Sequence, residues 1–305
     1  GTLRGQEGSY QSIPIDAFET NLWWDGSDLR LKGLTLEALG GTATLDVQVP
    51  ENAAVSVAGS LDRLSAEPLL HWLFDFGSAG LGSRVSGPID LSFPRGASNL
   101  LSGTGNLQLT PDPALGDPLT GRFPFRATNG VVTMTGARLE VPSTSVALDG
   151  SILPDRSLKL DVKLASDDLG TTDALAVRVR RALGAPQPEF LGATGQGRFQ
   201  GRGSGTTGEP IFTGGFIGAG VSYLGVSWGD VNWSGTASAL DLKSDSLTVT
   251  RGSARVDLSG TQRLGARGVD DAMDLSVVVK GWPAKDLLQV VDSKVELDGA
   301  VSGTF

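Results

Sequence analysis

Cysteine is absent from this sequence of 305 residues, and histidine occurs once, at His71. Without cysteine the chain can form no disulfide, no thiolate metal site and no cysteine nucleophile. A single histidine also disfavours transition-metal sites and histidine-dependent catalytic triads. We therefore expect a protein that is not an enzyme, with no catalytic residue, no metal and no cofactor.

Basic residues are in the minority, and their 25 Lys and Arg against 34 Asp and Glu give a formal net charge of −9. Binding to a phosphate backbone needs a basic surface, so we expect no nucleic-acid partner. No apolar run approaches the roughly 18 residues of a membrane-spanning helix, and no signal-peptide pattern opens the chain. Because "AVSGTF" (300–305) stops inside a strand-like phrase, we expect a piece of a longer protein.

Glycine, in contrast, is abundant: it accounts for 43 of the 305 residues, about twice its average usage. It is scattered among Val, Leu, Thr and Ser, which favours many short strands with tight turns and bulges. Leu45 and Val47 alternate with Thr44 and Asp46, and similar alternation recurs along the chain. This period of two predicts antiparallel strands with one apolar and one polar face.

One phrase occurs three times. In each copy four apolar positions are separated by two, five and nine residues, and an aspartate follows the last of them. The copies are Leu29, Leu31, Leu36 and Leu45–Asp46; Val132, Met134, Leu139 and Leu148–Asp149; and Leu240, Leu242, Leu247 and Val256–Asp257. The third apolar positions of the copies are Leu36, Leu139 and Leu247. The first two are 103 residues apart and the last two are 108 residues apart, which indicates a repeat of about a hundred residues. We expect one continuous array over 1–305, with approximate units 1–100, 101–192 and 193–305.

Each repeat also offers one short helix. Leucines at close helical spacing predict helices over 66–74, 171–182 and 284–291. Helices this short cannot cover a long sheet, so its apolar side must be buried in another way. The sheet either packs on itself as a sandwich or barrel, or curls into a trough whose apolar wall meets a ligand.

Several phrases resemble the TamB/AsmA-like family of envelope proteins. They are "GTGNLQLTPDP", "GRGSGTTGEPIFTGGF", "WSGTASALDLKSDSLTVTRGSARVDLSG" and "WPAKDLLQVV". The resemblance covers nearly the whole chain and is firmest over 190–305. Whether the chain is TamB itself or another AsmA-like relative stays open. The fold that it implies is all-β, mostly antiparallel, as an elongated curled sheet or "β-taco" repeat with a hydrophobic groove and a few short helices.

The same resemblance implies a function and a location. The groove would shield acyl chains and transport phospholipid between the inner and outer membranes, and the protein would also assist outer-membrane protein assembly. It would lie in the periplasm of a Gram-negative bacterium. An N-terminal anchor absent from this sequence would hold it in the inner membrane. A C-terminal domain, also absent, would bind a TamA-like outer-membrane assembly barrel.

The apolar positions of the repeated phrase and two neighbours are the groove candidates, and we expect the aspartates on the polar face. The candidates are Leu29, Leu31, Leu36, Leu45, Val47, Val132, Met134, Leu139, Leu148, Leu240, Leu242, Leu247, Val256 and Leu258. The alternative is a structural or adhesive surface β-repeat with a closed apolar core and no ligand. A polysaccharide-cleaving β-solenoid is disfavoured, because no carboxylate or basic cluster recurs.

The stretch "GSGTTG" (203–208) formally satisfies the G-x-G-x-x-G pattern of dinucleotide-binding proteins. That fingerprint requires a helix to begin at the glycines. Here Glu209 and Pro210 follow, and then another strand-like phrase. We therefore expect a turn or a bulge and no nucleotide site.

Overall fold

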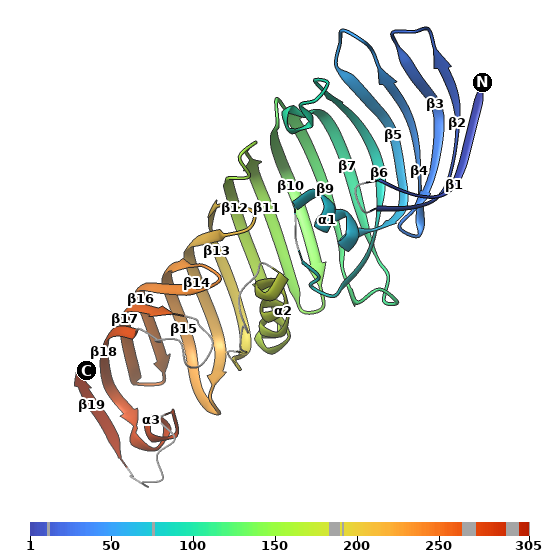
Figure 1. Ribbon diagram of the computed structural model, residues 1–305. Helices are drawn as coiled ribbons and strands as arrows, with labels where there is room; N and C mark the ends of the chain where they lie inside the picture. Colours follow the sequence, from blue (N-terminus) through green and yellow to red (C-terminus); the bar gives the residue numbers. More distant parts are fainter. Residues whose placement is uncertain are drawn as a thin grey trace. The chain divides into compact units, whose positions relative to one another are not determined.

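The computed structural model describes residues 1–10, 13–74, 77–182, 190, 192–263, 273–290 and 299–304. In this part of the chain, 19 β-strands form one open sheet, accompanied by three α-helices and one short 3-10 helix (Figure 1). Two compact units are present: Gly1–Pro142 with Ala147–Leu160, and Ser143–Val146 with Asp161–Phe305. We call them unit 1 and unit 2.

Unit 1 contains ten complete strands and one helix. The strands are β1 (Thr2–Tyr10), β2 (Ile13–Trp24), β3 (Leu29–Ala38), β4 (Gly41–Val49), β5 (Val55–Ser65), β6 (Leu81–Phe93), β7 (Ser102–Pro111), β8 (Asp117–Pro118), β9 (Thr120–Thr128) and β10 (Val131–Val141). The helix α1 (Ala66–Phe74) joins β5 to β6, and the 3-10 helix η1 (Ser98–Leu100) precedes β7.

Strands β11 (Thr144–Ile152) and β12 (Leu158–Ser166) each contribute residues to both units. Unit 2 continues with α2 (Leu169–Ala182), β13 (Thr194–Gly205), β14 (Pro210–Tyr223), β15 (Val226–Ala237), β16 (Asp241–Arg251), β17 (Ala254–Arg263), β18 (Met273–Pro283), α3 (Ala284–Val290) and β19 (Ala300–Thr304).

The strand order of the sheet follows the chain. In unit 1 the strands β1 to β7 pair antiparallel in succession, and in unit 2 so do β13 to β19. The two-residue β8 pairs parallel with β6, so that β9 pairs antiparallel with β7 and β10. Between α1 and α2 the chain passes through six long strands, β6, β7, β9, β10, β11 and β12. Between α2 and α3 it passes through six more, β13 to β18.

Several hairpins close with two residues that both have positive φ, the geometry of a type I′ turn. They are Leu39–Gly40, Asn129–Gly130 and Leu224–Gly225, with φ values between 49° and 80°. Type I′ turns match the right-handed twist of the strands that they join, and glycine adopts the second position without strain. Part of the glycine excess is explained by these turns.

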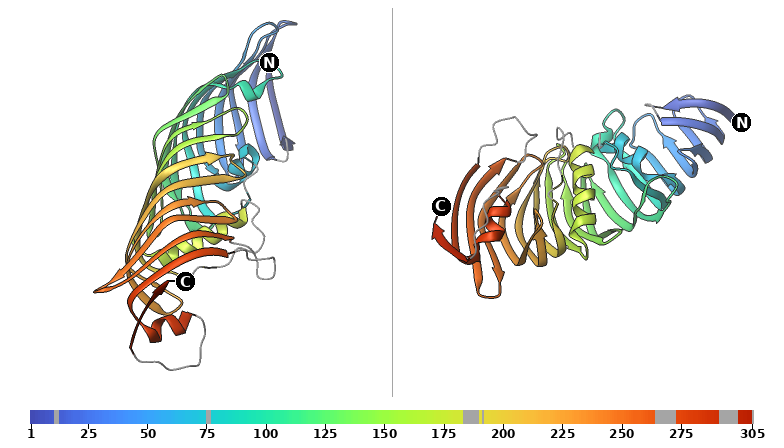
Figure 2. Two further views of the ribbon diagram at one scale, coloured as in Figure 1. Left: turned by 90° about the vertical axis from the view of Figure 1, so that its left-hand side faces the viewer. Right: turned by 90° about the horizontal axis from the view of Figure 1, so that it is seen from below.

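The helices lie against the sheet. Figure 2 shows α2 over one face of unit 2, where Leu169 lies 3.2 Å from the position that a Cβ at Gly197 would occupy. The three helices begin at Ala66, Leu169 and Ala284, against expected starts at 66, 171 and 284. The acidic Glu67 of α1 accepts hydrogen bonds from the backbone N–H groups of Ala79 and Leu81, which fixes the chain returning to β6.

The expectation of an all-β, mostly antiparallel sheet with a few short helices is confirmed. The described strands form an open sheet. Its edges are β1 and β19, and in the described residues no strand pairing closes it into a barrel. The apolar residues therefore form a sheet face in each unit.

Candidate functional site: the apolar sheet face

Cross-strand rows of apolar side chains define the candidate site in unit 1. Residues directly opposite each other in paired strands share a face, so the register identifies the members of each row. One row contains Leu22, Leu31, Val47, Val57 and Leu91. The next contains Leu34, Leu45, Gly59, Ile89, Gly105, Phe125 and Met134. We call the surface that carries these rows the apolar face.

Unit 2 repeats the arrangement. One row contains Phe199, Phe216, Trp233, Leu247, Leu258 and Val277, and the next contains Gly197, Gly218, Val231, Val249, Val256 and Val279. The opposite face of each unit carries the alternate residues, which are mostly polar. We call this surface the polar face.

The spacing of five inside the repeated phrase has a structural cause. Strict alternation would place residues five apart on opposite faces. A β-bulge interrupts the register in each copy, between Leu31 and Leu34, between Met134 and Arg138, and between Ser244 and Leu247. The extra residue restores the second half of each strand to the apolar face.

The repeated aspartates lie next to these bulges. Asp46 Oδ1 accepts a hydrogen bond from the backbone N–H of Gly33 at 2.7 Å. Asp149 Oδ1 accepts one from the N–H of Gly136 at 2.5 Å, at the same place in the second copy. Gly33 and Gly136 have φ of 62° and 70°, so the carboxylate binds an amide that the bulge has turned out of the ladder.

In the third copy the aspartate, Asp257, has different hydrogen-bond partners. Asp257 accepts hydrogen bonds from the Arg255 guanidinium and from Thr248 Oγ1, at 2.6 and 2.8 Å. The bond from Arg255 is the main cause that holds the pKa of the Asp257 carboxyl below its ordinary value. Ser244 stands where the other copies have glycine, so its bulge has another geometry. The expected polar-face position of the aspartates is correct for Asp46 and Asp257, whose cross-strand partners lie on that face.

Most of the candidate residues are half-buried. They are Leu29, Leu31, Leu36, Leu45, Val47, Val132, Leu139, Leu148, Leu242, Leu247 and Leu258. Met134 and Val256 are only 3% and 7% exposed, so the protein itself covers them. The strand placement expected for Leu240 is wrong: β16 begins at Asp241, and Leu240 lies in the preceding turn with 37% of its surface exposed.

Val256 is covered because α3 folds over this end of unit 2. Val256 belongs to a core cluster with Val249 and Val279, against which Leu287 of α3 packs. The fully buried Trp282 joins this cluster and stacks on Trp228, with ring centroids 5.1 Å apart.

Arg251 holds α3 in place over this cluster. Its guanidinium lies 4.9 Å from the ring centroid of Trp282 and pairs with Asp286 of α3. Burial of the cluster by α3 therefore removes Val256 from the surface that a ligand could reach.

Aromatic rings on the apolar face were not among the sequence candidates. Phe125 lies over Gly105, its ring 2.2 Å from where a Cβ would stand, and Trp233 covers Gly235 in the same way at 2.8 Å. The rings lie over bare backbone, and this close approach requires glycine beneath them. The repeated phrases that combine glycine with phenylalanine, such as "GRF" (197–199), were the available signal.

The remaining motifs have structural roles. Residues 203–208 end β13 and form the turn before β14, with Thr206 donating its N–H to the carbonyl of Glu209, so the expected turn is confirmed. In the basic stretch 177–181, Arg180 donates to the carbonyl of Ala239 at 2.8 and 3.0 Å, and burial lowers its pKa.

The residues that the structure describes contain no group of three or more acidic or histidine side chains placed to hold a metal ion. Among the described helices, none is long and apolar enough to cross a membrane.

Comparison with known proteins gives no relative for this chain. No protein-family model, no curated protein and no solved structure matches it.

Proposed function

We propose that this chain is a segment of a periplasmic, bridge-like lipid-transfer protein of a Gram-negative cell envelope. In this proposal the apolar face shields acyl chains and carries phospholipid between the inner and outer membranes. The TamB/AsmA-like resemblance supplies the two membranes, the periplasmic location and the partners. These partners are the inner membrane and a TamA-like outer-membrane assembly barrel.

The observation that carries the proposal is the continuity of the apolar rows. In unit 2 one row runs from Phe199 to Val277 across six strands, and no charged side chain interrupts it. Its members Phe199, Trp233 and Leu258 are only half-buried. Large contiguous apolar surfaces are rare on monomeric soluble proteins and mark contact with a ligand or a membrane.

Continuity matters energetically for moving a lipid. Exposing an acyl chain of about 15 methylenes to water costs on the order of 12 kcal/mol, at ~0.8 kcal/mol per methylene. Separate pockets would impose barriers of that order between them. Neighbouring strands lie ~4.8 Å apart, so an acyl chain that moves along an apolar row meets a new apolar side chain at every strand. Such a path needs no catalytic residue, which agrees with the expectation that the protein is not an enzyme.

The rival reading is a structural or adhesive repeat with a closed apolar core. Such a core requires a second layer that packs on the apolar face. The described strands form one sheet, and each six-strand interval is followed by one short helix. This single layer favours a ligand-covered face over a closed core.

Photo-crosslinking tests the proposal with matched positions on the two faces. A photoreactive amino acid replaces Leu45 or Leu258 on the apolar face, and Thr44 or Ser259 on the polar face, in cells with labelled phospholipid. We expect lipid adducts at Leu45 and Leu258 and none at their neighbours. Equal labelling at both faces, or no adduct at Leu45 and Leu258 in folded protein, would refute the proposal.

Function can be tested with Leu45→Arg and Leu258→Arg, because each places a charge on the proposed lipid path. We expect loss of lipid capture and of envelope integrity, while circular dichroism shows retained strand content. Thr44→Arg is the control on the polar face. If both apolar-face variants fold and keep lipid capture, the apolar face is not the path.

A further inference from the structure

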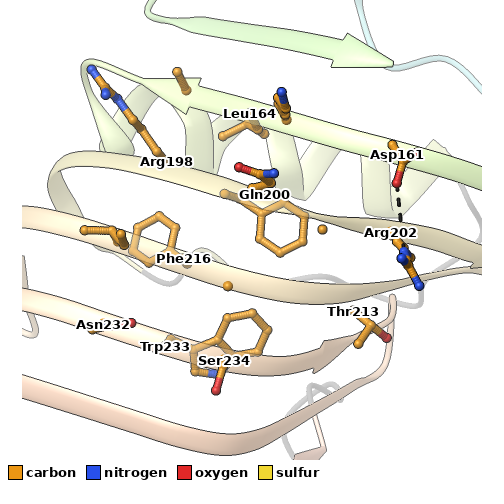
Figure 3. A pocket seen from close by; sticks show the side chains of 16 residues that line it. Asp161, Leu164, Arg198, Gln200, Arg202, Thr213, Phe216, Asn232, Trp233 and Ser234 are labelled. Atoms are coloured by element: carbon orange, nitrogen blue, oxygen red, sulfur yellow. Dashed lines mark ion pairs between the residues drawn. The ribbon is translucent and has the colours of Figure 1, made fainter. Parts of the chain in front are cut away.

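A second site candidate lies in unit 2, where an open hollow of ≈ 850 Å³ is lined by residues of four adjacent strands, β12 to β15. Figure 3 shows it with Arg198, Gln200 and Arg202 along one strand. We call it the polar hollow.

The register places most of its lining on the polar face. Arg198, Ile217 and Asn232 form one cross-strand row, and Gln200, Gly215 and Ser234 form the next. Arg202 and Thr213 begin a third row, and Arg202 also pairs with Asp161 of β12. Phe199, Phe216 and Trp233 of the apolar row also line it, so the hollow has a polar majority and an aromatic part.

Gly215 lies between Gln200 and Ser234 in the middle row of this lining. A Cβ added there would meet no atom nearer than 3.4 Å, the carbonyl oxygen of Trp233, and the backbone of Gly215 is not in the left-handed region. Glycine in a strand interior is less stable than alanine, because its backbone loses more conformational freedom on folding. Since neither packing nor backbone geometry requires glycine here, the missing side chain is best explained by the hollow that it leaves.

The charge of the hollow differs from that of the chain. Lys163, Arg198 and Arg202 line it, against the single carboxylate of Asp161, whereas the whole protein carries a net charge of −9. Arg202 and Asp161 are 4.0 Å apart and 87% and 77% exposed, so their pairing is loose. Lys163 and Arg198 have no ion pair with any described residue. The amides of Gln200 and Asn232 and the hydroxyl of Ser234 add neutral hydrogen-bonding groups.

We infer that the polar hollow binds a phosphate-bearing ligand. Lys163, Arg198 and Arg202 contact the phosphate, and the amides and the Ser234 hydroxyl bind the hydroxylated part beside it. Charge-assisted hydrogen bonds from Arg and Lys are the usual means of holding phosphate. A volume of this size accommodates a ligand of a few hundred daltons. The phosphate can belong to a soluble sugar phosphate or to a phospholipid headgroup at a membrane surface.

The experiment measures binding of glucose 1-phosphate by calorimetry and binding of phosphatidylglycerol vesicles by co-sedimentation, using the complete 305-residue chain. Uncharged glucose and phosphatidylcholine vesicles are the ligand controls. Binding of the sugar phosphate identifies a soluble source, and binding of phosphatidylglycerol vesicles alone identifies a headgroup. Binding of neither probe overturns the inference.

Four variants separate the hollow from general surface charge. We expect Lys163→Gln and Arg198→Gln each to weaken binding about three- to fivefold. We expect Gly215→Leu to abolish it by filling the hollow, with an unchanged circular dichroism spectrum. Lys243→Gln removes a cation from the same face outside the lining and should leave affinity unchanged.

Equal weakening by Lys243→Gln and Arg198→Gln, or full binding by folded Gly215→Leu, contradicts the site. The outcome is independent of the proposed lipid path, because Leu45 and Leu258, the crosslinking positions for that path, do not line the hollow.

Discussion

The carboxylate of Asp46 binds the backbone N–H of Gly33 at 2.7 Å, across two strands and 13 residues of sequence. The same bond recurs between Asp149 and Gly136, again 13 residues apart. In both places it satisfies an amide that a bulge has removed from the ladder. The aspartate therefore belongs to the repeat because it stabilises the bulge that keeps the leucines on one face.

Removing this carboxylate should destabilise the sheet. Asp46→Ala leaves the Gly33 amide without its partner, and we expect a loss of about 1 kcal/mol, below the range for fully buried charged hydrogen bonds because Asp46 is exposed. Asp46→Asn keeps an acceptor oxygen and should cost less. Urea unfolding measures both. Asp90→Ala removes another exposed carboxylate of the polar face and should have little effect; an equal loss there would contradict the specific role of Asp46.

Replacement by alanine should change the stability of the protein in opposite directions at Gly33 and at Gly215. Gly33 has φ of 62°, so Gly33→Ala imposes left-handed strain of about 1 kcal/mol although the added Cβ would meet no atom. Gly215→Ala adds a methyl group without strain and should stabilise by about 0.5 kcal/mol by restricting the unfolded chain. Thermal unfolding of the two variants checks the signs. Destabilisation by Gly215→Ala would remove the argument that the fold does not need this glycine.

Stability should depend on pH through Asp112. Arg84 Nε donates to Asp112 Oδ2 at 2.8 Å, and this bond is the main cause that lowers the pKa of Asp112 from its ordinary value of 3.8. A carboxyl whose pKa is lower in the folded state stabilises the protein above the unfolded value and loses this contribution as pH falls through the folded value.

Asp112→Asn should therefore be destabilising at pH 7, and its difference from the wild type should shrink as pH falls below about 4. Denaturant midpoints between pH 7 and pH 2 test this. Asp62→Asn, at an exposed carboxylate of the same unit, is the control and should change the midpoint little at pH 7. A difference for Asp112→Asn that stays constant to pH 2 would show that the pair with Arg84 does not carry the effect.

Val256 and Leu258 should separate stability from ligand contact. Val256→Ala opens a cavity beneath α3 and should cost about 2 kcal/mol, whereas the half-buried Leu258→Ala should cost about 1 kcal/mol or less. Denaturant unfolding gives both values. If Leu258→Ala proves the more destabilising, then α3 or another element covers Leu258 more completely than Val256. Leu258 would then not belong to the surface that a ligand can reach.

The repeat and its strands could be predicted because their cause is local. Alternation of Leu45 and Val47 with Thr44 and Asp46 reflects one buried and one wet face, and paired registers reproduce it. The helix at 66–74 was predicted to the residue. The spacing of two, five and nine already contained the bulge, since an odd step between residues of one face requires an extra residue in the strand.

Other features depend on contacts between distant segments. The covering of Val256 by α3 depends on Leu287 and Trp282, which no local pattern connects to it. The polar hollow requires four strands in register, and its central residue, Gly215, has no side chain to attract notice. The misplacement of Leu240 has a local reason: Ser238 Oγ accepts the N–H groups of Leu240 and Asp241, which forms a turn where alternation suggested a strand.

The six long strands between successive helices, with the two-residue β8 left aside, have a consequence for how such an array can change in length. Antiparallel neighbours run in opposite directions, so after an even number of strands the chain is again on the side of the sheet, at the strand ends, from which it started. Insertion or deletion of a whole hairpin keeps the following helix on that side. Insertion of a single strand would move the helix to the opposite ends of the strands, away from its docking residues. Variation in length should therefore occur in steps of two strands.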